Sequence, residues 1–149
     1  GTLPLKGPRR VKLMIVDDNP RIRELVQRLG ESSGASVVCC EDGCEAATAY
    51  RRERPDWVLM DLSMPGMDGL AATRGLMRDF PAARVILVSD LDTPSLRVAA
   101  AQAGARGYLI KDHLTEIRLL AGQGGQDLPP GMAEMQVVVE RIDRGGRQE

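Results

Sequence analysis

The chain has 149 residues, which is enough for one domain with a sizeable core and too few for two large domains. Its 20 basic and 21 acidic residues give a net charge of −1, which excludes a strong overall attraction to nucleic acid or to an acidic membrane. Hydrophobic residues make up 43% of the chain and charged residues 28%, as in ordinary soluble globular proteins, and no apolar run approaches the roughly 20 residues of a membrane span.

Three cysteines, Cys39, Cys40 and Cys44, lie close together in the sequence. Neighbouring residues on a strand point to opposite faces, so Cys39 and Cys40 suit neither a disulfide nor a shared metal site. We expect reduced, structural cysteines in a cytoplasmic protein, and the N-terminus lacks the apolar stretch of a secretory signal. A metal or redox role is the alternative.

The first half of the chain alternates short apolar runs with helical patterns. Residues 11–16 are predicted to form a strand, followed by a helix that Asn19 caps and that has Pro20 at its first position. The next predicted elements are a strand at 35–40, a helix at 44–54 that stops at Pro55, and a strand at 56–60.

The second half repeats the alternation. Asp68 is expected to cap a helix that begins near Gly69 and ends before Pro81. The remaining predicted elements are a strand at 84–89, a helix at about 94–103, a strand at 107–110 and a helix at about 113–121. Five βα units with apolar strands indicate an α/β fold, a parallel sheet covered by helices on both faces, with functional groups at the carboxyl ends of its strands.

The chain changes character after Ala121. Residues 122–149 begin with "GQGGQDLPPG", which is typical of a linker. A short amphipathic helix is possible at 132–142, and its apolar side would need a partner surface, so a homodimer is possible. The sequence predicts a folded domain at 11–121 followed by this tail.

Polar residues follow the apolar runs directly. Asp17 and Asp18 come after the first predicted strand, Asp61 after the third, Ser89 ends the fourth, and Lys111 comes after the fifth. Three carboxylates at one edge of a sheet would repel one another unless they bound a cation, and oxygen ligands of this kind suit Mg²⁺. The cation, the ammonium and the hydroxyl are what a phosphoryl group on a carboxylate would need.

Each of these residues also has an ordinary structural explanation. Asp17 and Asp18 could simply favour a helix N-terminus, and Asp68 reads as a helix cap. Ser89 could be a cap or turn residue, and Lys111 a solvated surface lysine. Their occurrence together at successive strand ends favours a site.

The stretches "LMIVDDN", "LMDLSMPGMDG", "VILVS" and "AGARGYLIKD" resemble the receiver domain of bacterial two-component response regulators. The resemblance covers about residues 11–121. It implies a flavodoxin-like, doubly wound fold with five parallel strands in the order 2-1-3-4-5. It also implies a phosphoprotein of two-component signalling, or of a phosphorelay, that switches conformation.

The resemblance implies a role for each matching residue. Asp61 would accept the phosphoryl group from a sensor histidine kinase. Asp18, Asp61 and the backbone carbonyl of Ser63 would bind Mg²⁺ directly, and Asp17 largely through water. Lys111 would pair with the phosphoryl oxygens, Ser89 would move to bind them, and Tyr108 would turn inward behind Ser89. Pro65, Gly66 and Gly69 would let the backbone turn while leaving Asp61 open.

Two positions depart from the family pattern. Asp90 stands where a small or apolar residue is usual, and a carboxylate there is expected to alter the rate of phosphorylation or dephosphorylation. Asp112 stands where proline is common, and "GARGYLIKD" resembles the LuxR/NarL-type subgroup, whose receivers precede a helix-turn-helix. No such domain follows, so the chain is either a fragment of a transcription regulator or a stand-alone receiver. It should not bind DNA alone, since DNA binding would need that absent domain.

Three functions compete. The first is a phosphorylation-dependent switch that controls an output, in particular transcription. The second is a receiver-like interaction module that works without phosphorylation, which Asp90 supports. The third is a phosphatase with an aspartate nucleophile, which Ser63 argues against because a general acid is usual there. We therefore expect no enzyme. The kinase, the target genes and the oligomeric state are not indicated.

Overall fold

The computed structural model describes residues 9–64, 67–122, 128, 129, 131 and 132. Within them, five parallel strands form one sheet in the order β2-β1-β3-β4-β5, which confirms the predicted topology. The strands are β1 (Lys12–Val16), β2 (Ser36–Cys40), β3 (Trp57–Asp61), β4 (Val85–Ser89) and β5 (Gly107–Ile110). The helices are α1 (Pro20–Ser32), α2 (Gly43–Glu53), α3 (Gly69–Asp79), α4 (Pro94–Gln102), the 3₁₀ helix η1 (Lys111–Glu116) and α5 (Ile117–Gly122).

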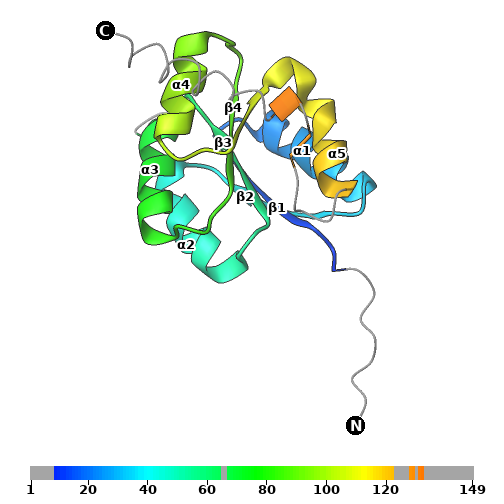
Figure 1. Ribbon diagram of the computed structural model, residues 1–149. Coiled ribbons are helices and arrows are strands. Elements are labelled where there is room, and N and C mark those ends of the chain that lie inside the picture. The colour runs from blue at the N-terminus through cyan, green and yellow to red at the C-terminus, as the bar shows by residue number, and fades with distance from the viewer. Residues whose placement is uncertain (1–8, 65–66, 123–127, 130, 133–149) are drawn as a thin grey trace, which may run out of the picture.

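Helices cover both faces of the sheet (Figure 1). Alternate strand residues point to opposite faces, so each strand contributes to two separate cores. On one face Met14, Met60 and Leu87 pack with side chains of α2, α3 and α4. On the other face Ile15 and Leu59 pack with α1 and α5. Apolar residues are therefore needed at successive strand positions, as the uninterrupted apolar runs predicted.

Several local predictions are confirmed. The Asn19 side chain caps α1 by accepting from the Arg21 N–H, and Pro20 opens the helix. The Asp68 side chain caps α3 by accepting from the Ala71 N–H at 2.7 Å. Cys39 is exposed whereas Cys40 is buried, as expected for neighbouring strand residues that point to opposite faces.

The segment after β5 differs from the prediction. A helix was expected from about residue 113, but residues 111–116 form the 3₁₀ helix η1, and α5 begins only at Ile117. The break lies at His113, whose φ of −113° and ψ of 26° are not helical. Leu114 is buried within this turn, and burying it there takes precedence over a regular α-helix.

The helix predicted at 132–142 lies outside the described residues, except for Met132. In the described part of the chain, every helix is too short or too polar to cross a membrane.

Candidate functional site

The carboxyl edge of the sheet gathers the polar residues that follow the strands. Asp17 comes directly after β1, Asp61 is the last residue of β3, Ser89 is the last of β4, and Lys111 comes directly after β5. Because β1, β3, β4 and β5 are consecutive neighbours in the sheet, residues far apart in the sequence meet at this edge.

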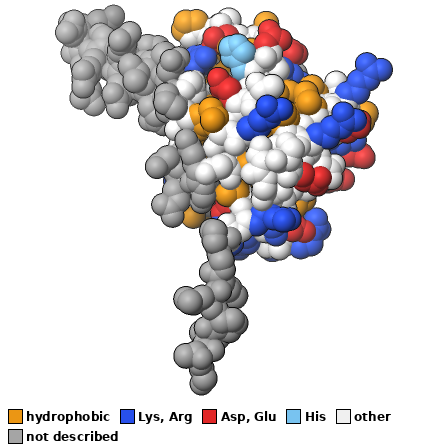
Figure 2. Space-filling view, turned by 90° about the vertical axis from the view of Figure 1, so that its right-hand side faces the viewer, with side chains coloured by type: hydrophobic (Ala, Val, Ile, Leu, Met, Phe, Trp, Pro, Cys, Tyr) orange, Lys and Arg blue, Asp and Glu red, His pale blue; other side chains and the backbone are white. Residues whose placement is uncertain are grey.

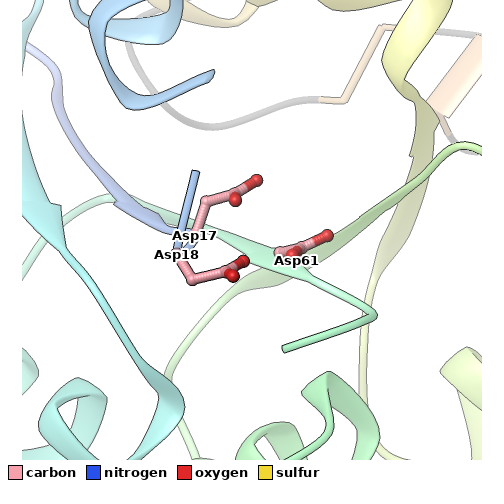
Figure 3. A group of neighbouring side chains, drawn as sticks. All are labelled: Asp17, Asp18 and Asp61. Atoms are coloured by element: carbon pink, nitrogen blue, oxygen red, sulfur yellow. The ribbon is translucent and has the colours of Figure 1, made fainter. Parts of the chain in front are cut away.

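Three carboxylates lie side by side there. One oxygen from each of Asp17, Asp18 and Asp61 lies within 4.8 Å of the others. Figure 3 shows the three side chains projecting to the same side from the ends of β1 and β3. Asp17 and Asp61 are buried, with 0% and 2% of their surface exposed, while Asp18 is exposed. The group is therefore open to solvent on the side of Asp18.

Lys111 is the cation that partners the buried carboxylates. Its Nζ lies 3.2 Å from Asp61 Oδ1 and 3.5 Å from Asp17 Oδ2. Three carboxylates and one ammonium leave a net charge of about −2 when all are ionised, so the described side chains balance only part of the negative charge.

This imbalance appears in the pKa values of the buried groups. Burial, together with the charge of Asp17, raises the pKa of Asp61 to about 6 against the opposing effect of Lys111. Burial also raises the pKa of Asp17, although the Asn19 N–H and Lys111 act to lower it. Burial acts to lower the pKa of the Lys111 ammonium, but Asp17 and Asp61 together raise it. The site therefore favours additional positive charge.

The donor set fits a divalent cation such as Mg²⁺. Asp17 Oδ1 accepts from the Asn19 N–H at 2.8 Å, whereas the buried Asp17 Oδ2 has the Lys111 ammonium 3.5 Å away but no hydrogen bond of standard geometry among the described residues. All the candidate ligands are oxygens, with a solvent-exposed side where waters could complete an octahedron. A buried carboxylate oxygen with only this one long contact would be stabilised further by a cation or a water molecule beside it.

The loop after Asp61 holds that carboxylate in place. The Ser63 N–H donates to the Asp61 carboxylate, and Ser63 itself is exposed. Gly69 donates its N–H to the Leu62 carbonyl at 2.8 Å, and a Cβ at Gly69 would lie 2.1 Å from the Asp61 carbonyl oxygen. The need for glycine at position 69 is thus steric, because α3 starts against the backbone of β3. Pro65 and Gly66 lie outside the described residues.

Ser89 and Tyr108 are joined through the backbone of Leu91. The Ser89 hydroxyl accepts from the Leu91 N–H at 3.0 Å, and the Tyr108 hydroxyl donates to the Leu91 carbonyl at 2.6 Å. Ser89 also lines a pocket of about 380 Å³ together with Asp61, Ser63 and Asp90. Tyr108 is 1% exposed, so its ring already points inward in this structure.

Asp90, the departure noted in the sequence, is exposed on the rim of this pocket. Its charge contributes to raising the pKa of Lys111, behind the larger effects of Asp17 and Asp61. Asp90 therefore adds negative potential at the opening without joining the buried carboxylates.

Two arginines near the site were not identified from the sequence. Arg23 of α1 donates to the Asp17 carbonyl at 2.7 Å, which steadies the turn that carries Asp17 and Asp18. Arg97 of α4 pairs with Asp92 at 2.5 Å and lies 5.1 Å from the centre of the Tyr108 ring. Their positions on helical faces were the only sequence signal, and such positions are usually solvated.

Comparison with known proteins gives a consistent result. Residues 13–121 match the family model described as the response regulator receiver domain. The chain is 40% identical over 116 residues to the nitrate/nitrite response regulator protein NarP of Escherichia coli (strain K12), covering 76% of this chain and 54% of NarP. It is 36% identical over 102 residues to the chemotaxis protein CheY of Listeria monocytogenes serovar 1/2a, covering 68% of this chain and 86% of CheY.

Among solved structures, a two-component response regulator of the LuxR family from Aurantimonas sp. SI85-9A1 matches with a TM-score of 0.72 and 30% identity, covering 91% of this chain and 99% of that chain. The matches to NarP and to this LuxR-family regulator bear out the resemblance to the LuxR/NarL-type subgroup. The chain spans about half the length of NarP.

Proposed function

The chain belongs to the family of response regulator receiver domains of two-component signalling, and we propose that it is a switch phosphorylated on Asp61. The observation that carries the proposal is the pair of buried carboxylates, Asp17 and Asp61, held 3.5 and 3.2 Å from the ammonium of Lys111 beside the exposed Asp18. We assign the receiver unit to residues 11–121.

The reaction we propose is transfer of a phosphoryl group to a carboxylate oxygen of Asp61. A bond forms between that oxygen and phosphorus, and the bond from phosphorus to the donor breaks, so that a histidine of a sensor kinase or a molecule of acetate leaves. The modification adds negative charge and strong acceptor oxygens. Lys111 lies where it can neutralise that charge, and Ser89 in the adjoining pocket can donate its hydroxyl proton.

Mg²⁺ is the cofactor that we propose. Asp18, Asp61 and the Ser63 carbonyl would bind it directly, and Asp17 largely through water. When bound, the ion would screen the repulsion between the attacking carboxylate and the donor phosphate. The exposure of Asp18 and the long 3.5 Å contact between Asp17 Oδ2 and Lys111, which leaves room for a further positive charge, support this assignment.

The switch would work through the path from Ser89 to Tyr108. A hydroxyl drawn towards a phosphoryl oxygen would leave the Leu91 N–H, and the Leu91 carbonyl is held by Tyr108. The arrangement of β4, α4 and β5 would then differ between the two states. We propose that the output is transcription, controlled through a helix-turn-helix domain outside the residues that match the receiver family, because the chain is 34% identical to about half of the transcriptional regulatory protein DegU of Brevibacillus brevis.

The test is a phosphotransfer assay on the intact protein with acetyl phosphate and Mg²⁺. We expect a mass increase of about 80 Da, which is one HPO₃ group, that requires Mg²⁺ and is labile in base. The Asp61→Asn variant should form no adduct. Asp68→Asn is the matched control, because it makes the same change in the same loop and asparagine also caps helices well.

Failure of acetyl phosphate and of a phosphorylated kinase to modify the folded, Mg²⁺-binding protein would overturn this proposal. The chain would then be an interaction module that works without phosphorylation.

A further inference from the structure

Residues beyond α5 return to the folded domain and pack on it. Leu128, Pro129, Gly131 and Met132, which we name the docking segment, lie beside η1 and α5 and are drawn in orange in Figure 1. Met132 is 0% exposed and belongs to the apolar core that contains Ile117 and Leu120 of α5. Met132 follows directly after the linker-like stretch and is the first residue of the helix considered possible at 132–142, so the chain beyond the linker-like stretch begins with a fully buried side chain.

The docking segment makes close contact with the start of β5. A Cβ at Gly107 would lie 3.1 Å from the Met132 carbonyl oxygen and 3.4 Å from Leu128 Cδ1. β5 is an edge strand of the sheet, and the absence of a side chain at Gly107 lets the segment's backbone approach it. The domain thus has a surface shaped to receive these residues.

The docking segment also reaches a pocket that Tyr108 lines. This pocket of about 250 Å³ is bordered by Tyr108, Arg97, His113, Glu116 and Gly131, with Asp92 at its edge. Gly131 lies against the Glu116 carboxylate, 3.5 Å from the position that a Cβ would take. Gly107 contacts the docking segment. The next residue, Tyr108, donates a hydrogen bond to the Leu91 carbonyl, so two neighbouring residues of β5 contact the docking segment and the backbone beside Ser89.

Figure 2 shows this side of the molecule, where the histidine lies close to acidic side chains. The surroundings of the pocket carry both signs of charge. Arg97 pairs with Asp92, and His113 and Glu116 lie on η1. A change in the position of Arg97 or Tyr108 would therefore alter both the shape and the charge of the surface that Gly131 touches.

We propose that the surface formed by β5, η1 and α5 is a binding site for the chain's own docking segment, and that docking is coupled to the state of Ser89 and Tyr108. The coupling rests on the proposed phosphorylation of Asp61. Phosphorylation draws Ser89 away from the Leu91 N–H, Tyr108 and Arg97 shift, and the docking segment is released. Release would carry the signal into whatever follows residue 132.

Thermodynamic linkage makes the coupling reciprocal. If the docked segment binds the unphosphorylated state more tightly, weakening the docking must favour the phosphorylated state by the same factor. Couplings between sites in proteins typically amount to about 5–150-fold. We expect a value near the lower end, about tenfold, because the contact is small.

The first measurement is hydrogen–deuterium exchange of the whole chain, read on the peptide that contains the docking segment. We expect exchange to become about tenfold faster after phosphorylation by acetyl phosphate and Mg²⁺, with the adduct followed by intact mass. Unchanged or slower exchange in the phosphorylated protein would overturn the coupling and leave the proposed function standing. Absence of any adduct from acetyl phosphate and also from a phosphorylated kinase would overturn both.

Two variants test the docking site without phosphorylation. Gly107→Ala should speed exchange of the docking segment, because its Cβ would press on the Met132 carbonyl. Gly75→Ala is the matched control, since a Cβ there would meet only the Arg78 guanidinium, at 3.8 Å. Met132→Ser removes the buried side chain of the docking segment and leaves β5 unchanged. This second variant is needed because the Cβ of Gly107→Ala would also lie 3.3 Å from Ile86 and could disturb the sheet.

Met132→Ser should also increase the fraction phosphorylated at limiting donor, by up to about tenfold. Leu119→Ser changes an α5 leucine that is 52% exposed and should leave both readouts unchanged. If Met132→Ser alters neither the exchange of the segment nor the phosphorylated fraction, the segment is not a ligand of this surface.

Discussion

Two aspartates at opposite ends of β3, Asp56 and Asp61, have opposite surroundings. Asp56, just before the strand, is 9% exposed and forms an ion pair with Arg9, while its other oxygen accepts from the Lys12 N–H at 2.8 Å. Its backbone carbonyl accepts from Arg84 Nε at 3.0 Å. Asp61, at the end of the strand, is 2% exposed and shares a single lysine with Asp17.

The comparison separates a structural carboxylate, Asp56, from the proposed phosphorylation site, Asp61. Arg9 and the Lys12 N–H satisfy the two carboxylate oxygens of Asp56, so this side chain holds Arg9 and the start of β1 next to β3. Asp61 is buried beside another carboxylate, which raises its pKa to about 6. Crowding like charges in a buried site costs stability, and such a cost is typical of sites arranged for binding or reaction.

The largest expected effect concerns Lys111, which forms an ion pair with Asp61 at the carboxyl end of β3. Lys111→Met should slow formation of the Asp61 adduct by about 100-fold, because it removes the positive charge next to the accepting oxygen. Initial rates of adduct formation at fixed Mg²⁺ and acetyl phosphate measure this. Lys12→Met, at the other end of the sheet where Lys12 pairs with Glu53 at 3.2 Å, is the control and should react normally. An unchanged rate in Lys111→Met would remove Lys111 from the mechanism.

Removing the structural carboxylate should affect stability instead. Asp56→Ala leaves the Lys12 N–H without its acceptor and Arg9 without its partner, so we expect the free energy of unfolding to fall by about 2 kcal/mol. Urea denaturation measures this. Asp79→Ala, which removes an exposed carboxylate 3.9 Å from Arg78, should change the free energy by less than about 0.5 kcal/mol. Equal effects from the two variants would mean that Asp56 is not a structural anchor.

Removing the carboxylate of Asp61, the proposed phosphorylation site, should change the stability in the opposite direction. The pKa of Asp61 is about 6 in the folded protein and about 4 in an unfolded chain, so the folded state holds the extra proton between these values. Stability is then lost as the pH rises from about 4 through 6. In Mg²⁺-free buffer at pH 7, Asp61→Asn should therefore raise the free energy of unfolding by about 1–2 kcal/mol.

The gain in free energy of unfolding of the Asp61→Asn variant over the parent should become smaller towards pH 4. It should also become smaller when Mg²⁺ is added to the variant and to the parent. Urea denaturation at several pH values tests this, with Asp68→Asn as the exposed control. An Asp61→Asn protein that is less stable than the parent at pH 7 would show that the carboxylate is satisfied in the same way as Asp56.

The smallest expected effect concerns Asp90, on the rim of the pocket. Asp90→Asn should speed phosphorylation by acetyl phosphate about two- to threefold at low salt, since it removes a repulsive charge from the path of an anionic donor. Because Asp90 is exposed, the gain should disappear at about 0.5 M salt. The ratio of initial rates at two salt concentrations measures this, and a slower Asp90→Asn protein would show that Asp90 assists the reaction.

Local sequence signals predicted most of the elements. The apolar runs located all five strands to within about one residue, and Asn19 and Asp68 were correctly identified as helix caps. The error at residues 111–116 arose because no glycine or proline marks the kink at His113, which forms where Leu114 is buried. The burial of Met132 was likewise not predicted, because its partners in the core come from distant strands and from α5.

The sequence by itself determined the order of the elements, the family resemblance and which polar residues end the strands. Only the tertiary structure decided that Lys111 reaches both Asp17 and Asp61, that Arg97 lies over Tyr108, and that the docking segment contacts Gly107. The physical reason is that the side-chain periodicity of a helix or strand depends on residues close in the sequence. The energy of charge interactions instead depends on the distances between the groups and on their burial, and both are set only when the parallel strands lie side by side.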